Sequence, residues 1–145
     1  MNTTPVTREI FIKRIADLCL KSGLLGLPKD ERDSHILLKS MILLIGPSGD
    51  FSQQEIDAKL KTWISEVSLK IEGLDHVTLR RWLIDFGYLT RNANGTHYRV
   101  VPGGPRPELF DPAVEQIDIL EAVRGAQEEM ERRKREFMEK RGKNA

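Results

Sequence analysis

The segment of residues 75–101 constrains what this chain can fold into more than any other part of it. Its first half carries apolar residues at i, i+3, i+4 and i+7, the spacing of a helix with one face in a core. These residues are Leu79, Trp82, Leu83 and Phe86. We therefore expect a helix over residues 75–86 that buries one side.

A hairpin follows this helix almost without a connection. Gly87 can adopt the left-handed conformation that ends a helix. The pair Asn94-Gly95 accepts positive φ angles and lies between two short runs that alternate in polarity. We expect a two-stranded wing over residues 88–101. A helix, a stop and a hairpin form the second half of a winged helix, a fold that often reads DNA.

The preceding residues supply the other helices of such a fold. Residues 29–45 carry Asp30, Glu31 and Asp33 near their start, where acids suit the positive end of a helix dipole, and end in the apolar run MILLI. A turn is expected at residues 46–49. Ser52 and Glu55 then match a capping box, which predicts a helix over residues 53–68. Three helices followed by a hairpin give the order of a winged helix.

Two further helices are expected to flank this unit. Thr4 can cap a helix that has Pro5 at its first position and extends over residues 5–21. The proline- and glycine-rich residues 102–110 read as a linker. Asp111, followed by proline, can then start a long charged helix.

The predicted fold is mainly α with a small β-hairpin: a winged-helix (helix-turn-helix-type) core with an extra N-terminal helix and a long charged C-terminal helix. The expected organisation is residues 1–27 for the N-terminal helix and linker, 28–101 for the winged-helix-like domain, 102–110 for the linker and 111–145 for the C-terminal helix.

Charge is polarised along the chain, although the net charge is only +1. Residues 76–106 hold five arginines against one acid, and residues 108–131 hold eight acids against one arginine. Residues 132–143 hold seven bases against two acids. A net charge near zero does not by itself indicate a polyanionic partner. The opposite signs within the last helix are compatible with antiparallel pairing of two copies.

The outward face of the helix before the wing is the candidate DNA contact. In a winged helix this helix lies in the major groove, where arginine can donate two hydrogen bonds to guanine. The wing can contact the phosphate backbone. The candidate DNA-binding residues are His76, Thr78, Arg80, Arg81, Asn94, His97 and Arg99.

Arg81 also has a purely structural interpretation. Asp85 stands four residues later, within helical reach, and Arg91 follows the turn. An ion network of Arg81, Asp85 and Arg91 can tie the helix to the wing without a ligand. Arg80 has no acid at helical spacing, which favours an exposed contact. The sequence leaves both interpretations of Arg81 and Arg91 open.

Patterns typical of enzymes do not occur in the sequence. The three histidines lack metal-ligand spacing, and no glycine-rich phosphate loop or nucleophile elbow is present. We therefore expect no catalysis, metal, cofactor or small-molecule ligand. The single cysteine, Cys19, allows no internal disulfide. Without a membrane-spanning run or a signal peptide, the expected location is the cytoplasm, with no membrane partner.

The same segment resembles a known bacterial family. The pattern Leu79-Arg80-Arg81-x-Leu83-x-Asp85-x-Gly87-x-Leu89-x-Arg91, followed by Gly95 and Tyr98, is similar to the signature of domain of unknown function 2087 (DUF2087), over roughly residues 28–101. The resemblance implies a small winged-helix-type module. Some members are appended to helix-turn-helix regulators, which implies a role near transcription. The family lends no catalytic or ligand residues.

Together these features predict a winged-helix DNA-binding protein with a role in transcriptional regulation. We expect a homodimer formed through the terminal helices, or a complex with a partner regulator. The alternative is a winged-helix module for protein–protein interaction or dimerisation without direct DNA contact.

Overall fold

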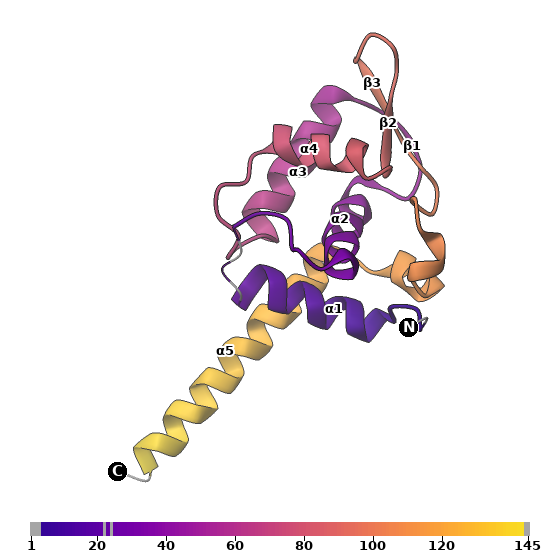
Figure 1. The fold of residues 1–145 in the computed structure, drawn as a ribbon. Helices are drawn as coiled ribbons and strands as arrows, with labels where there is room; N and C mark the ends of the chain where they lie inside the picture. The colour runs from indigo at the N-terminus through magenta and orange to yellow at the C-terminus, as the bar shows by residue number, and fades with distance from the viewer. Residues whose placement is uncertain (1–3, 22, 24, 144–145) are drawn as a thin grey trace.

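The computed structural model describes residues 4–21, 23 and 25–143, which form a helical body with one small sheet at its edge (Figure 1). The α-helices are α1 (Arg8–Ala16), α2 (Glu31–Ile45), α3 (Gln53–Glu66), α4 (His76–Asp85) and α5 (Ile119–Lys143). The strands are β1 (Gly49–Ser52), β2 (Leu89–Arg91) and β3 (His97–Val100). A π-helical turn (Asp17–Lys21) extends α1, and two 3-10 helices (Pro107–Leu109 and Pro112–Gln116) precede α5. The predicted fold class is confirmed.

The order α2–β1–α3–α4–β2–β3 is that of a winged helix, with a third strand that the sequence did not reveal. The predicted turn at residues 46–49 leads into β1, which pairs antiparallel with β3 in a sheet of order β1-β3-β2. Asp50, Arg99 and Thr90 are neighbours across the three strands. The four residues GDFS have no alternating apolar pattern, so only pairing with the distant β3 makes them a strand.

The helix start predicted at Thr4 and Pro5 is wrong. Helix α1 begins at Arg8, and the Thr7 hydroxyl accepts a hydrogen bond from the Ile10 amide at 3.2 Å. Val6 is instead part of a parallel bridge with Phe110, in which the Val6 amide donates to the Leu109 carbonyl at 2.8 Å. A segment about 100 residues away in the sequence therefore decides where this helix starts.

Residues 102–110, predicted to be a linker, pack against the wing. A Cβ atom on Gly104 would lie 2.9 Å from the Tyr88 ring, so the chain can approach this closely only with glycine there. Pro105 similarly faces Gly87. The segment is a strap that holds the C-terminal part of the chain against the core.

The predicted helix start at Asp111 is also corrected. Asp111 caps the 3-10 helix of Pro112–Gln116, where its side chain accepts from the Ala113 amide at 2.8 Å. Helix α5 begins at Ile119, after Asp118 accepts from the Glu121 amide at 3.2 Å. The break between them lets both Val114 and Ile117 point into the core.

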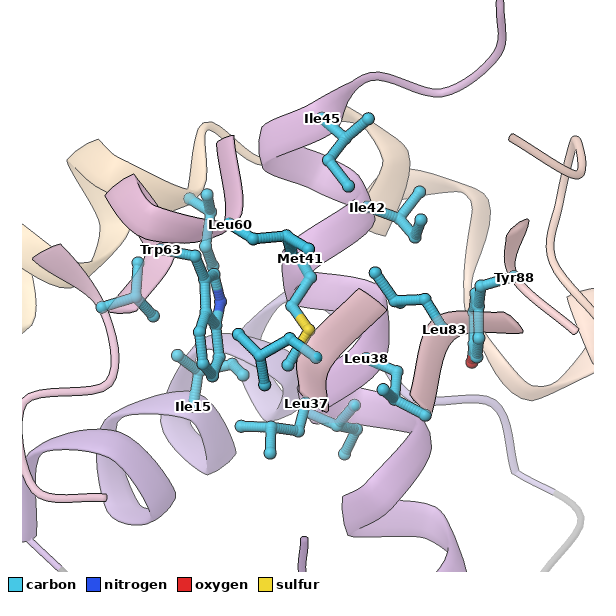
Figure 2. Close-up of a cluster of buried hydrophobic side chains, with 14 of the residues drawn as sticks. Ile15, Leu37, Leu38, Met41, Ile42, Ile45, Leu60, Trp63, Leu83 and Tyr88 are labelled. Carbon is cyan, nitrogen blue, oxygen red and sulfur yellow. The ribbon is translucent and has the colours of Figure 1, made fainter. Parts of the chain in front are cut away.

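Helix α2 runs through the middle of one continuous core (Figure 2). Every residue from 34 to 42 is buried, which a helix packed on several sides requires. Trp63 is fully buried beside it, and its indole nitrogen donates to the Ser40 hydroxyl at 3.0 Å. The same core includes side chains from both flanks of the winged helix: Val6, Phe11, Ile15, Phe110, Val114, Ile119 and Val123.

The flanking segments are thus parts of the same folded unit as the winged helix. Residues 1–3, 22, 24 and 144–145 of the predicted segments lie outside the described residues. The first half of α5 packs on the core through Ile119 and Val123, whereas residues 131–142 are all exposed. This second half projects from the body on the side away from the sheet (Figure 1).

Candidate nucleic-acid interface

Helix α4 occupies the position of the recognition helix, and its ends are set by local chemistry. The Asp75 carboxylate accepts a hydrogen bond from the Thr78 amide at 2.8 Å, and this bond lowers the pKa of Asp75. Gly87, with φ 86°, ends the helix. Leu79 and Leu83 are fully buried, so the predicted helix and its core face are confirmed.

Arg80 turns toward α3, although the sequence favoured an exposed contact. Its guanidinium forms an ion pair with Asp57, and only 15% of the Arg80 side chain is exposed. The guanidinium also lies 5.9 Å from the centre of the Tyr98 ring. His76 Nε2 is 4.0 Å from the same Asp57 carboxylate. No spacing rule finds this cluster, because Asp57 stands 23 residues before Arg80 and only the packing of α3 on α4 brings them together.

The predicted ion network of Arg81, Asp85 and Arg91 is not formed. Within residues 4–21, 23 and 25–143, no ion pair involves any of the three side chains, all of which belong to exposed residues. Packing turns the neighbour Arg80, one residue away on the helix, toward an acid and leaves Arg81 outside. The exposure that the sequence suggested for Arg80 is thus found at Arg81.

Arg81 and Arg91 instead line one hollow, which we call the α4–wing hollow. It has a volume of about 330 Å³, and a second hollow, on the hairpin, has a volume of about 310 Å³. Its lining residues are Val77, Arg80, Arg81, Ile84, Asp85, Arg91 and Tyr98. The second hollow is lined by Asp50, Thr90, Arg91, Asn92, His97, Tyr98 and Arg99. Arg91 and Tyr98 belong to both, so the two hollows adjoin along the wing.

The polar candidates next to these two arginines are engaged in local bonds. The Thr78 hydroxyl donates to Asp75 at 3.2 Å. In the wing turn, Thr96 donates through its hydroxyl to the Asn94 side chain at 2.7 Å, and the same oxygen lies 3.0 Å from His97 Nδ1. These contacts shape the turn and leave Asn94 and His97 exposed at its surface.

Arg99 is paired across the sheet. Its Nε donates to Asp50 Oδ1 at 2.8 Å. This hydrogen bond lowers the pKa of Asp50 and raises that of Arg99, because each charged form stabilises the other. Both side chains are more than half exposed, so solvent screens the pair.

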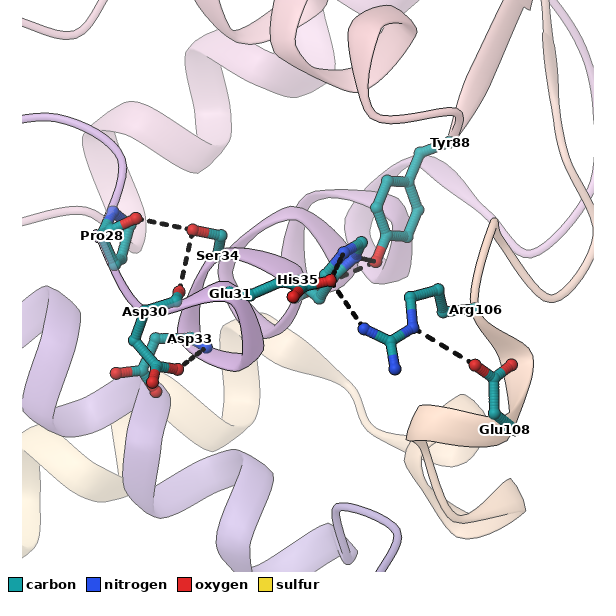
Figure 3. Close-up of polar contacts among 9 residues, drawn as sticks. All are labelled: Pro28, Asp30, Glu31, Asp33, Ser34, His35, Tyr88, Arg106 and Glu108. Carbon is teal, nitrogen blue, oxygen red and sulfur yellow. Dashed lines mark hydrogen bonds and ion pairs between the residues drawn. The ribbon is translucent and has the colours of Figure 1, made fainter. Parts of the chain in front are cut away.

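A polar cluster with a buried pair at its centre involves residues that the sequence patterns did not identify (Figure 3). His35 Nδ1 lies 2.7 Å from the Tyr88 hydroxyl, and both side chains are buried. Desolvation lowers the pKa of His35 and raises that of Tyr88. Arg106 of the strap donates to Glu31 at 2.7 Å and to Glu108 at 3.2 Å. The cluster joins α2, the wing and the strap, and ion pairs with Glu31 and Glu108 hold Arg106 at its surface.

Other kinds of site were also sought in the described part of the chain. It contains no group of three or more His, Cys, Asp or Glu side chains that could hold a metal ion. Cys19 is buried, and burial raises its pKa to about 12, which disfavours a reactive thiolate. None of the described helices has the length and apolar character needed to cross a membrane.

Comparison with known proteins gives one family. No curated protein and no solved structure matches the chain. A family model described as "Uncharacterized protein conserved in bacteria (DUF2087)" matches residues 23–100, which is more than half of the 145 residues. The match covers α2 to β3 and ends where the strap begins. The chain therefore belongs to the DUF2087 family of uncharacterized bacterial proteins.

Proposed function

We propose that this chain binds DNA through α4 and the wing, and that it acts in transcriptional regulation in the bacterial cytoplasm. The observation that carries the proposal is the pair Arg81 and Arg91. They are exposed, they lack an acidic partner among the described residues, and they line one hollow between the recognition-helix position and the wing. Cations at this place suit the phosphates that flank a major groove.

The charge available for DNA is smaller than the sequence suggested. Three of the five arginines in residues 76–106 are paired with acids: Arg80, Arg99 and Arg106. Arg81 and Arg91 remain. Each neutralised phosphate contributes about −0.9 to the slope of log K against log salt, so the two arginines of one protomer give a slope between about −1, if they share a phosphate, and about −2. Binding by a single protomer is therefore weak, and useful affinity requires two protomers.

The basic end of α5 does not add to the same contact. In Figure 1 residues 131–143 extend away from the body on the side opposite the sheet. A duplex lying across α4 and the wing is out of reach of this end within one protomer. The proposal therefore depends on Arg81, Arg91 and the wing.

Fluorescence anisotropy on a labelled duplex at 50 and 200 mM salt tests the proposal. We expect salt-dependent binding that Arg81→Gln weakens, with the magnitude of the slope reduced by at most about 1 per protomer. Arg124→Gln is the matched control, since Arg124 is an exposed arginine on α5 and does not line the α4–wing hollow. Absence of binding at the lower salt concentration, or equal losses in the two variants, would contradict the proposal.

A second candidate function is protein interaction through the projecting end of α5. Phe137 and Met138 are each 60% exposed on this end, and all of residues 131–142 are exposed. An apolar pair on a projecting helix suits contact with another protein, either a second copy or a partner regulator.

Light scattering on the full chain and on a chain that ends after Met130 tests this candidate. The shortened chain keeps Ile119 and Val123 in the core, so we expect it to stay folded and to lose any dimer formed through α5. A cut after Pro107 would instead remove five buried core side chains and is unsuitable: Phe110, Val114, Ile117, Ile119 and Val123. An unchanged mass after the cut at Met130 rules out α5 as the association element.

A further inference from the structure

We infer that the α4–wing hollow binds a single phosphodiester of the DNA backbone, and that duplex binding is consequently independent of base sequence. The inference rests on the proposed DNA-binding function and specifies what the surface recognises. It follows from three features of the hollow: the position of its cations, its net charge, and the residues left on α4 to contact bases.

The cations approach the hollow from two different elements. Arg81 is on α4, and Arg91 is the last residue of β2. Guanidinium groups donate parallel hydrogen bonds to phosphate oxygens, and two of them from different walls can hold a tetrahedral group from two sides. The volume of about 330 Å³ accommodates such a group at the surface. Arg80 forms part of the wall and is fixed by Asp57 and Tyr98.

The net charge of the hollow matches a diester. Arg80 and Asp57 neutralise each other. The remaining charged groups in the lining are Arg81, Arg91 and Asp85, which together give +1. A backbone phosphodiester carries one negative charge, whereas a phosphomonoester near neutral pH carries nearly two. Asp85 therefore disfavours the more highly charged group, and the hollow suits a linking phosphate in a nucleic acid strand.

Few side chains on α4 remain to read bases. The side chains of His76 and Arg80 lie next to Asp57. The Thr78 hydroxyl is bonded to Asp75. The exposed face consists of Val77, which is 44% exposed, together with Arg81 and Asp85. If Arg81 holds a phosphate, no arginine of α4 is left for the bidentate contact with guanine that gives most sequence discrimination.

The test compares two duplexes of equal length, one rich in G·C and one rich in A·T, by anisotropy at 50 mM salt. We expect dissociation constants within about threefold of each other, because each unfavourable base pair in a specific site costs about fivefold or more. Arg91→Gln should weaken binding of both duplexes by the same factor and reduce the magnitude of the salt slope by at most about 1 per protomer, whereas Arg124→Gln should change neither. A difference of more than tenfold between the two dissociation constants, or a ratio of them that Arg81→Gln changes, overturns the inference and leaves the proposed function intact.

A second experiment tests phosphate binding by the α4–wing hollow in the absence of DNA. Dimethyl phosphate is titrated into the full chain while the side-chain Nε–H signals of Arg81 and Arg91 are followed by NMR. Saturable shifts that sodium chloride at equal ionic strength does not produce, and that inorganic phosphate produces more weakly, support a diester site. If dimethyl phosphate binds and no duplex does, the site stands and the proposed function fails. If a duplex binds and dimethyl phosphate gives no shift, the site assignment fails alone.

Discussion

The two sides of the winged helix use their cations in opposite ways. On the side of α2, Lys39 is only 2% exposed, pairs with Glu115 and lies 5.9 Å from the centre of the Phe110 ring. On the side of α4 and the wing, Arg81 and Arg91 are exposed, with no acidic partner in the described residues. The first side is covered by neighbouring chain and the second is open to solvent.

The cover on the α2 side comes from outside the family match. Glu115 and Phe110 follow residue 100, where the family model ends. Helix α1 also packs on α2, and its buried Phe11 meets the Phe110 ring with centroids 6.0 Å apart. The comparison teaches that the segments added to the family unit decide which of its charged faces stays available to a partner.

The largest expected effect is on the covered side. Glu115→Gln leaves the buried Lys39 ammonium without its acidic partner, and we expect a loss of about 3 kcal/mol in the free energy of unfolding by urea. Lys39→Met together with Glu115→Gln should recover more than half of that loss, because an apolar side chain of similar length replaces the unpaired charge. Glu121→Gln, on the exposed face of α5, is the control. If Glu115→Gln is no less stable than this control, the ion pair with Glu115 does not stabilise the buried Lys39.

The next largest effect is a difference in stability between substitutions of the adjacent Arg80 and Arg81. Arg80→Gln removes a largely buried partner of Asp57, and we expect a loss of about 2 kcal/mol in unfolding free energy. Arg81→Gln should change it by less than about 0.5 kcal/mol, as is usual for exposed positions. Equal losses in the two variants, measured by urea denaturation, would mean that Arg81 has a structural partner after all. Arg81→Gln should in contrast lower DNA affinity.

A smaller effect is expected from the pH dependence of stability at the polar cluster of His35 and Tyr88. The pKa of His35 is lowered, chiefly by desolvation, so the folded state resists its protonation. For a base with a lowered folded-state pKa, the stabilisation is complete above the unfolded-state pKa of about 6.5 and declines as pH falls below it. We expect the unfolding free energy to fall between pH 7 and 5, by at most about 1.4 kcal/mol per pH unit.

His35→Gln should flatten this decline, measured as the urea midpoint against pH. His97→Gln removes an exposed histidine of the wing and serves as the control for loss of an imidazole ring. A decline that persists unchanged in His35→Gln would assign the pH dependence to other groups.

The smallest effect is expected at the exposed pair on the wing. Arg99→Gln removes the partner of Asp50, but both side chains are solvated, so the thermal midpoint should not change measurably. Its DNA affinity should fall less than that of Arg91→Gln, since Arg99 is already neutralised by an acid. A larger loss for Arg99 than for Arg91 would move the DNA contact from the α4–wing hollow to the outer face of the sheet.

Local patterns predicted the elements whose cause is local. The capping box of Ser52 and Glu55 forms as expected, with the Glu55 amide donating to the Ser52 hydroxyl at 3.1 Å. The apolar spacing around Leu79 and Leu83 located α4 and its buried face. Strand β1 and the starts of α1 and α5 were missed, because their bounds depend on pairing or packing with residues distant in the sequence.

What the sequence alone determined is the winged-helix unit: its helices, its stop at Gly87 and its hairpin follow from spacing, capping and turn chemistry within about ten residues. Only the tertiary structure decided which charges are available. Asp57 approaches Arg80 because α3 packs on α4, and Glu115 approaches Lys39 because the strap returns the chain to α2. Ion pairs between elements depend on three-dimensional packing, which spacing along one helix does not encode.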